Sequence, residues 1–128
     1  METRVVGSYR FILDFSQPIY EQLVQQFRQM LAKGEIELGS KLPSVRDFAV
    51  QMKINPSTVV RTYQELERDG LCEKRRGQGT FITSSASQVS ELRKEMAEGA
   101  LGSFVRTLQI LGVTREEAQK MIAEVDWK

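Results

Sequence analysis

The amino-acid sequence predicts a mainly helical α+β fold. Apolar side chains recur at helical spacing in five segments of the 128-residue chain. One glycine-rich turn separates two short runs suited to strands, so a β-hairpin is expected among the helices. With 41% hydrophobic and 27% charged residues, the chain has an ordinary globular composition and can bury a core without disulfides.

The first 34 residues are expected to contain one helix. Residues 9–15 are rich in aromatic side chains and form either a short strand or a packed arm. The first helix opens at Ser16–Pro18, with Pro18 in the first turn, where its missing N–H leaves no hydrogen bond unmade. Gly34 ends this helix. Its apolar stripe consists of Ile19, Leu23, Phe27, Met30 and Leu31.

Two shorter helices joined by a tight turn are predicted next. Ser44 suits the N-cap of the second helix, and Asp47 favours the same start. Asn55 then caps a third helix, with Pro56 at its first position and Gly70 at its end. Its inward positions are Val59, Thr62, Tyr63 and Leu66, and its outer polar stripe is Ser57, Arg61, Gln64 and Arg68.

A β-hairpin follows the third helix. Residues 71–76 and 80–83 flank the turn Gly77-Gln78-Gly79, and the basic run Lys74–Arg76 leads into that turn. The two glycines do not indicate a dinucleotide site, because a third glycine and a following helix are missing. The basic run suits an edge strand protected from aggregation by charge, a DNA backbone contact, or both.

The remaining residues are predicted to form a linker and two helices. Residues 84–87 form the linker, a long helix spans about residues 89–111, and a capping box at Thr114–Glu117 opens the last helix. Gly99 and Gly102 inside the long helix indicate a bend or the close approach of another helix. The apolar surface of this tail either joins two copies of the chain or folds back onto the first helix. The residues expected at a dimer interface are Leu101, Phe104, Val105, Leu108, Leu111, Met121, Ile122 and Val125.

Composition excludes several classes of function. The chain has no histidine, so Ser-His and Cys-His nucleophiles and histidine-bound metals are ruled out. The single cysteine, Cys72, excludes an internal disulfide and a resolving partner, and it is expected to be a small buried side chain. Neither a signal peptide nor a membrane span is visible, so a cytoplasmic protein without metal or cofactor is expected.

Positive charge collects in the middle of the chain. Residues 41–83 carry eight basic and five acidic side chains, whereas both flanking segments are slightly acidic. Two short helices followed by a hairpin form a winged helix-turn-helix, whose second helix enters the DNA major groove. By itself the outer stripe of the third helix is better explained as a solvated face. Together with the turn and the basic hairpin it favours DNA binding.

Arg46 is the first basic residue of the second helix. The macrodipole disfavours a cation near a helix N-terminus, so its position suggests a phosphate or guanine contact; an ion pair with Asp47 is the alternative.

Several sequence blocks resemble the GntR family of bacterial transcription regulators. They are Pro18–Leu23, Leu42–Arg46, Asn55–Leu71 and Gly77–Phe81, and the short two-helix tail resembles the YtrA subfamily. The resemblance implies DNA contacts by Arg46, Thr58, Arg61 and the Gly77–Gly79 loop. Family members more often have a basic residue where Val60 stands.

We therefore expect a DNA-binding regulator, mostly repressing, that recognises a palindromic operator as a homodimer. Residues 1–83 would bind DNA and residues 84–128 would dimerise; any small-molecule effector would bind at the dimer interface or between these two parts. The alternatives are a winged-helix module for protein–protein contacts and a small enzyme or ligand carrier, which the lack of a convergent polar site disfavours. The predicted DNA-binding residues are Ser44, Arg46, Ser57, Thr58, Arg61, Arg75, Arg76, Gly77, Gln78 and Gly79.

Overall fold

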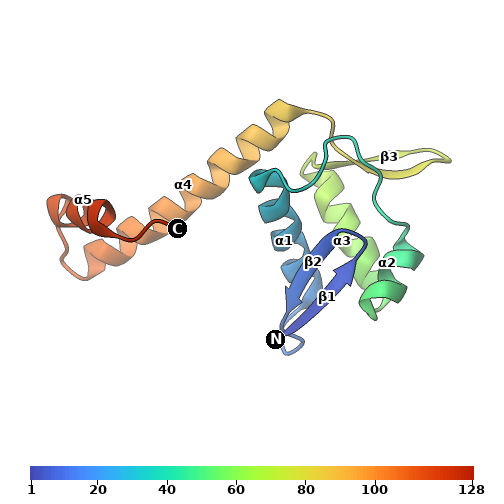
Figure 1. Ribbon diagram of the computed structural model, residues 1–128, viewed down its shortest axis with the longest axis horizontal. Helices are drawn as coiled ribbons and strands as arrows, with labels where there is room; N and C mark the ends of the chain where they lie inside the picture. Colours follow the sequence, from blue (N-terminus) through green and yellow to red (C-terminus); the bar gives the residue numbers. More distant parts are fainter. The chain divides into compact units, whose positions relative to one another are not determined.

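The computed structural model describes all 128 residues and contains five helices and two small antiparallel sheets (Figure 1). By their internal contacts the residues form two compact units, Met1–Leu92 and Arg93–Lys128. The predicted mainly helical α+β class with a winged helix-turn-helix is confirmed. In chain order the elements are β1 (Glu2–Val6), β2 (Tyr9–Leu13), α1 (Ile19–Lys33), α2 (Val45–Met52), α3 (Pro56–Arg68), β3 (Cys72–Arg75), β4 (Gly79–Ile82), α4 (Ala86–Ile110) and α5 (Arg115–Glu124).

The N-terminal segment is a β-hairpin; its second strand settles the choice between a short strand and a packed arm, and its first strand was not predicted. β1 and β2 pair from Glu2 opposite Leu13 to Val6 opposite Tyr9. Gly7 and the following residue make the two-residue turn, and Gly7 has φ 57°, which glycine adopts without steric cost. The first strand is therefore an addition to the predicted fold.

Two glutamines of α1 cover the outer edge of β2. Gln26 accepts from the backbone N–H of Ile12 (2.9 Å) and donates to its carbonyl (2.7 Å). Gln22, one turn earlier on the helix, does the same for Asp14, with both distances 2.8 Å. The amide side chains thus take the place of a neighbouring strand and satisfy an exposed edge.

The helix ends follow the predicted chemistry, with one shift at α1. Ser44 accepts from the backbone N–H of Asp47 (3.1 Å), and Asn55 accepts from that of Ser57 (2.9 Å). Pro18 is the N-cap of α1 and lies just before the first turn, so this helix begins one residue later than predicted. Its fixed φ still suits the approach to a helix.

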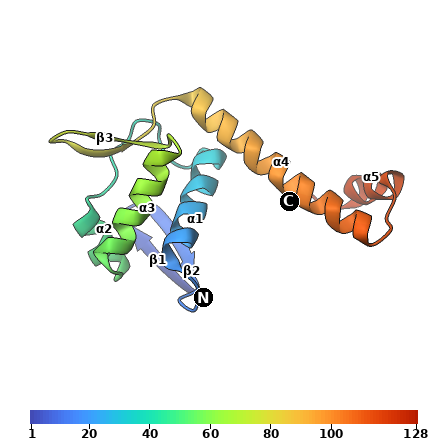
Figure 2. The same ribbon diagram turned by 180° about the vertical axis from the view of Figure 1, so that it is seen from behind.

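Aromatic rings form the centre of the first unit. Phe27 of α1 contacts Tyr9 and Phe11 of β2, with ring centroids 5.6 and 5.1 Å apart. Phe48 of α2 lies 5.8 Å from Phe11 and also 5.8 Å from Tyr63 of α3. The N-terminal hairpin is consequently part of the same core as the three helices. Figure 2 shows the ribbon of this hairpin and these helices from behind.

The predicted wing is present, and a third segment of the chain pairs with it. β3 and β4 pair from Cys72 opposite Ile82 to Arg75 opposite Gly79. On the other side of β4, Lys41 forms a β-bridge with Phe81, so the segment before α2 extends the wing sheet. Figure 1 shows this hairpin projecting beyond the helices of its unit.

The tail helices differ from prediction at their start. α4 begins at Ala86 rather than near Val89, because Ser85 accepts from the backbone N–H of Gln88 (3.2 Å) and opens the helix. Half of the predicted linker is therefore helical. α4 continues through Gly99 and Gly102 to Ile110, and a Cβ built at either glycine meets no other helix of the chain, so the close approach considered from the sequence is absent within the chain.

The capping box of α5 is formed as predicted. Thr114 accepts from the backbone N–H of Glu117 (3.2 Å), while the Glu117 carboxylate accepts from that of Thr114 (3.2 Å). No helix of the chain combines the length and apolar character needed to span a bilayer.

Candidate nucleic-acid interface

α3 separates its side chains as predicted from the sequence. Its four predicted inward residues are all buried, and the hydroxyl of buried Thr62 donates to the carbonyl of Thr58 (2.8 Å). The polar stripe on the opposite side, running from Ser57 through Arg61 to Arg68, faces away from the core. A helix of 13 residues is about 20 Å long, enough to lie across a major groove.

The first turn of α3 presents hydroxyls and a cap. Ser57 is exposed, but its hydroxyl donates to the Asn55 side chain (2.9 Å), which leaves it free only as an acceptor. Thr58 is half-buried. The two predicted residues therefore differ. The hydroxyl of Ser57 is part of the helix cap, whereas the side chain of Thr58 is partly exposed at the surface.

Arg61 is exposed and stacked on a tyrosine. Its guanidinium carbon lies 3.6 Å above the ring centroid of Tyr20 in α1, and its Nη2 donates to the tyrosine hydroxyl (2.9 Å). No carboxylate pairs with Arg61. Sequence analysis missed Tyr20, because 41 residues separate the two side chains.

Two other arginines of this surface are engaged by neighbouring acids. Arg68 pairs with Glu65 (2.6 Å) at the end of α3. Arg75 pairs with Glu73 (2.9 Å) and lies 4.0 Å over the ring of Phe81 in the wing. Both ion pairs are exposed and weak in water. The two arginines therefore stay available to bind a polyanion.

The start of α2 presents Arg46. This side chain is exposed and forms no ion pair with Asp47 or any other acid, so the alternative considered from the sequence is absent. Ser44 is committed to the helix N-cap. The loop before it is fixed by Tyr63, whose hydroxyl donates to the carbonyl of Pro43 (2.7 Å).

The wing tip carries Arg76 and the predicted loop residues Gly77, Gln78 and Gly79, all exposed. Gly79 has φ 115°, and a Cβ built there would approach the Lys41 side chain to 3.0 Å. Lys41 therefore lies beside the wing turn, a position that sequence analysis missed.

Basic side chains without an acidic partner gather on these elements. Arg46 belongs to α2, Lys53 to the turn before α3, and Arg76 to the wing. Such a surface attracts a polyanion, since each cation can be neutralised by a phosphate. The full set is Lys41, Arg46, Lys53, Arg61, Lys74 and Arg76.

Cys72 is the first residue of β3 in the wing, and its thiol is held protonated. The side chain is buried, and burial raises the pKa of its thiol to about 12. No cluster of acids and cysteine in the chain could hold a metal ion.

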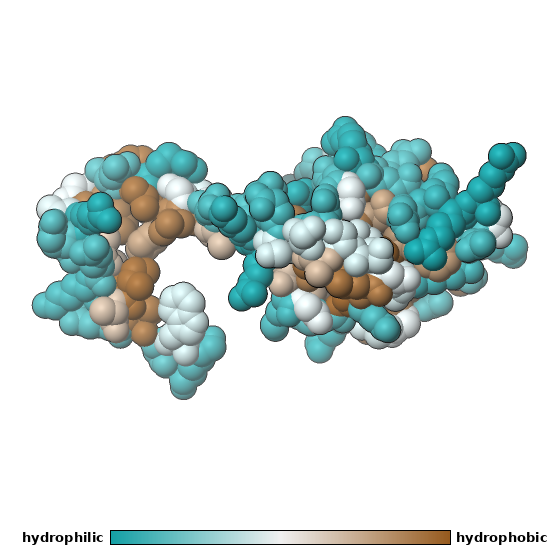
Figure 3. Space-filling model, turned by 90° about the horizontal axis from the view of Figure 1, so that it is seen from above, coloured by the Kyte–Doolittle hydropathy of each residue, from teal (hydrophilic) through white to brown (hydrophobic).

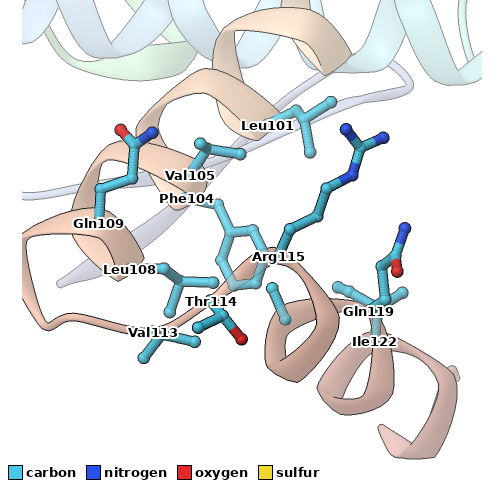
Figure 4. Close-up of a pocket in the computed structure, with 11 residues that line it drawn as sticks. Leu101, Phe104, Val105, Leu108, Gln109, Val113, Thr114, Arg115, Gln119 and Ile122 are labelled. Atoms are coloured by element: carbon cyan, nitrogen blue, oxygen red, sulfur yellow. The ribbon is translucent and has the colours of Figure 1, made fainter.

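The second unit has an apolar groove between α4 and α5. Figure 4 shows Phe104 and Leu108 of α4 facing α5 across it, with Arg115, Gln119 and Ile122 on the α5 side. The groove has a volume of about 570 Å³. Figure 3 shows hydrophobic side chains of this unit gathered around the hollow.

The predicted dimerisation residues differ in exposure. Leu108 is buried and Phe104 half-buried, so both pack within the unit. The other six remain exposed, Leu101 by 59% and Leu111 by 69%; the rest are Val105, Met121, Ile122 and Val125.

Comparison with known proteins decides the family. Residues 19–82, which include the three helices and the wing, match the sequence model of the bacterial regulatory proteins of the gntR family. The chain belongs to the GntR family.

Close relatives extend this similarity into the tail. YhcF, an uncharacterized HTH-type transcriptional regulator of Bacillus subtilis, is 48% identical over 102 residues, covering 80% of this chain and 84% of YhcF. The HTH-type transcriptional repressor YtrA of the same organism is 39% identical over 111 residues, covering 86% and 85%. The chain is thus a YtrA-like GntR regulator, as the sequence blocks and the short tail predicted.

Solved structures of GntR regulators share the fold. A GntR family transcriptional regulator from Listeria monocytogenes superposes with a TM-score of 0.81 at 31% identity, covering 89% of this chain and all of that one. YtrA from Sulfolobus acidocaldarius, a GntR-family transcription factor, reaches 0.54 at 28% identity, covering 72% and 97%. As a member of this family, the protein is a DNA-binding transcriptional regulator.

Proposed function

We propose that this GntR regulator binds a two-fold-symmetric operator as a homodimer and represses transcription. In this proposal α3 enters the major groove, the wing and the start of α2 contact the backbone on either side, and the tail joins two copies. Residues 1–83 form the DNA-binding part and residues 84–128 the dimerisation part.

The outer stripe of α3, flanked by unpaired cations, is the observation that carries the proposal. Arg61 has a planar fork of donors and no competing carboxylate, so it suits the O6 and N7 atoms of a guanine. Lys41, Arg46 and Arg76 lie on neighbouring elements and suit phosphates. Phosphate contacts would position α3, and Arg61 would read sequence.

Dimerisation is supported by the apolar surface of the tail. Six predicted interface residues remain exposed although the unit has its own packing between α4 and α5. A second copy would cover this surface by a two-fold contact. Two copies of α3 spaced by one DNA turn, about 34–36 Å, would read a palindrome.

Repression is proposed from similarity. YtrA of Bacillus subtilis, a transcriptional repressor, covers most of this chain at 39% identity. A dimer bound across an operator that overlaps a promoter would exclude RNA polymerase by occupancy alone.

Selection of bound duplexes from a random pool tests DNA recognition. The wild-type protein should enrich one inverted repeat whose half-site centres lie about 10–10.5 base pairs, or a multiple of that, apart. Enrichment of no sequence would contradict sequence-specific binding. Enrichment of a single asymmetric site would contradict the two-fold arrangement.

A further inference from the structure

We propose that Tyr20 of α1 is a positioning residue for DNA reading: its ring and hydroxyl hold the guanidinium of Arg61 in the orientation that meets a base. This inference rests on the proposed function, because it concerns how Arg61, the proposed base-contacting side chain, is oriented by a residue outside the helix-turn-helix.

The contact has two parts. The guanidinium carbon of Arg61 lies 3.6 Å above the ring centroid of Tyr20, and Nη2 of the same group donates to the tyrosine hydroxyl (2.9 Å). The hydroxyl in turn donates to the carboxylate of Glu21 (3.2 Å). The phenol oxygen is thereby oriented to accept from the arginine.

Two other arginines of the chain stack on aromatic rings, but less closely. Arg75 lies 4.0 Å from the centroid of Phe81, and Arg4 lies 4.7 Å from that of Phe15. In neither pair does the ring carry a hydroxyl that could accept from the guanidinium. In the Tyr20–Arg61 pair one side chain therefore supplies both the stacked ring and a hydrogen-bond acceptor for the guanidinium.

Stacking on Tyr20 leaves free the N–H donors of Arg61 that would contact a base. A guanidinium has five N–H donors in its plane, and Tyr20 occupies the face and one donor. The remaining donors suffice for a bidentate guanine contact, and the side chain is exposed. A free arginine would lose much of its rotamer freedom on binding DNA, whereas a stacked one has already lost it.

The pair also connects α3 to α1 at the exposed surface. Tyr20 is only half-buried, whereas Leu23 and Phe27, which lie further along α1, are fully buried. Removal of the Tyr20 ring is therefore expected to loosen the Arg61 side chain more than it disturbs the packing of the core.

A double-mutant cycle tests the inference on the duplex selected above and on a scrambled duplex. Tyr20→Leu should weaken operator binding by about 3- to 30-fold, the range of a cation–π contact, with a smaller effect on the scrambled duplex. In an Arg61→Ala background the same change should alter binding by less than about twofold, because Tyr20 acts through Arg61. Tyr20→Phe, which keeps the ring, should restore part of the affinity.

Phe15→Leu is the matched control, because it removes the ring from the Arg4 pair and should leave operator binding unchanged. Additive effects of Tyr20→Leu and Arg61→Ala would overturn the inference while operator binding by the wild type would still support the proposed function. Failure of the wild type to bind any duplex would overturn both.

A measurement without DNA keeps the inference testable if a variant is destabilised. In the wild type the NMR order parameter of the Arg61 Nε–H should be high, and it should fall in Tyr20→Phe and further in Tyr20→Leu. An order parameter that is the same in all three proteins would overturn the inference, whatever their thermal stabilities.

Discussion

Among single residues, Arg61 has the most specific role. Replacement by alanine removes a bidentate donor, so operator binding should weaken by about 1–3 kcal/mol and discrimination should relax at one base position. Arg68→Ala is the comparison on the same helix: it removes an exposed cation near the end of α3 and should weaken all duplexes alike without changing base preference. Competition binding with single-base operator variants measures both effects. An unchanged affinity and base preference in Arg61→Ala would contradict its role.

Cys72 gives a prediction about reactivity. Because its thiol has a pKa of about 12, it stays protonated in the folded protein at every pH well below that value. Because the thiol is buried and protonated, a thiol reagent such as iodoacetamide should react with the native protein at pH 8 far more slowly than with the urea-unfolded protein. Equal rates in the two states would show that Cys72 is accessible and ionised.

At the scale of elements, the wing should supply affinity without sequence preference. Arg76→Ala and Lys41→Ala should each weaken binding to all duplexes alike and should reduce the slope of log affinity against log salt by about 1. Lys33→Ala, at the end of α1, serves as a basic control outside the proposed interface. Binding titrations at several salt concentrations measure the slope. An unchanged slope would remove that side chain from the interface.

The N-terminal hairpin depends on the glutamines of α1. Gln26→Ala would leave both backbone groups of Ile12 without their present partner, and because these groups are exposed the free energy of unfolding should fall by about 0.5–1.5 kcal/mol. Gln25→Ala is the neighbouring control, because Gln25 is exposed and forms no side-chain hydrogen bond within the chain. Urea unfolding compares the variants. Equal stability would show that water replaces the amide without cost.

Elements with local signals could be predicted from the sequence, and contacts between distant segments could not. The caps at Ser44, Asn55 and Thr114 lie within a few residues of the groups they bind, so their helices were predicted well. β1 was missed because its strand is short and largely exposed, although the two-residue turn after it was a usable signal. The start of α4 was misplaced because a serine-rich segment was interpreted as a linker.

In the candidate site, too, residues with a local sequence signal could be predicted, and residues joined to it by long-range contacts could not. Its arginines and wing glycines could be named from motifs and from a helical stripe. Lys41 and Tyr20 belong to it only through pairing across long sequence separations, with Phe81 and with Arg61. Such partners follow from tertiary packing, which no local pattern encodes.

At the scale of the whole molecule, assembly should depend on exposed apolar residues of the tail. Leu101→Asp and Val105→Asp introduce charge on exposed positions of α4 and should shift the protein from dimer to monomer. Thr107→Asp introduces the same charge at another exposed position of that helix and should leave the dimer intact. Sedimentation velocity at micromolar concentration separates the species. A monomeric wild type would contradict the proposed assembly.

The number of chains bound to one operator links assembly to DNA recognition. Sedimentation of the protein with its selected duplex should give a complex of two wild-type chains per duplex. Leu101→Asp should bind the same duplex much more weakly, because each subunit then reads one half-site alone. One wild-type chain bound at full affinity, with Leu101→Asp equal to it, would contradict recognition of a two-fold operator by a homodimer.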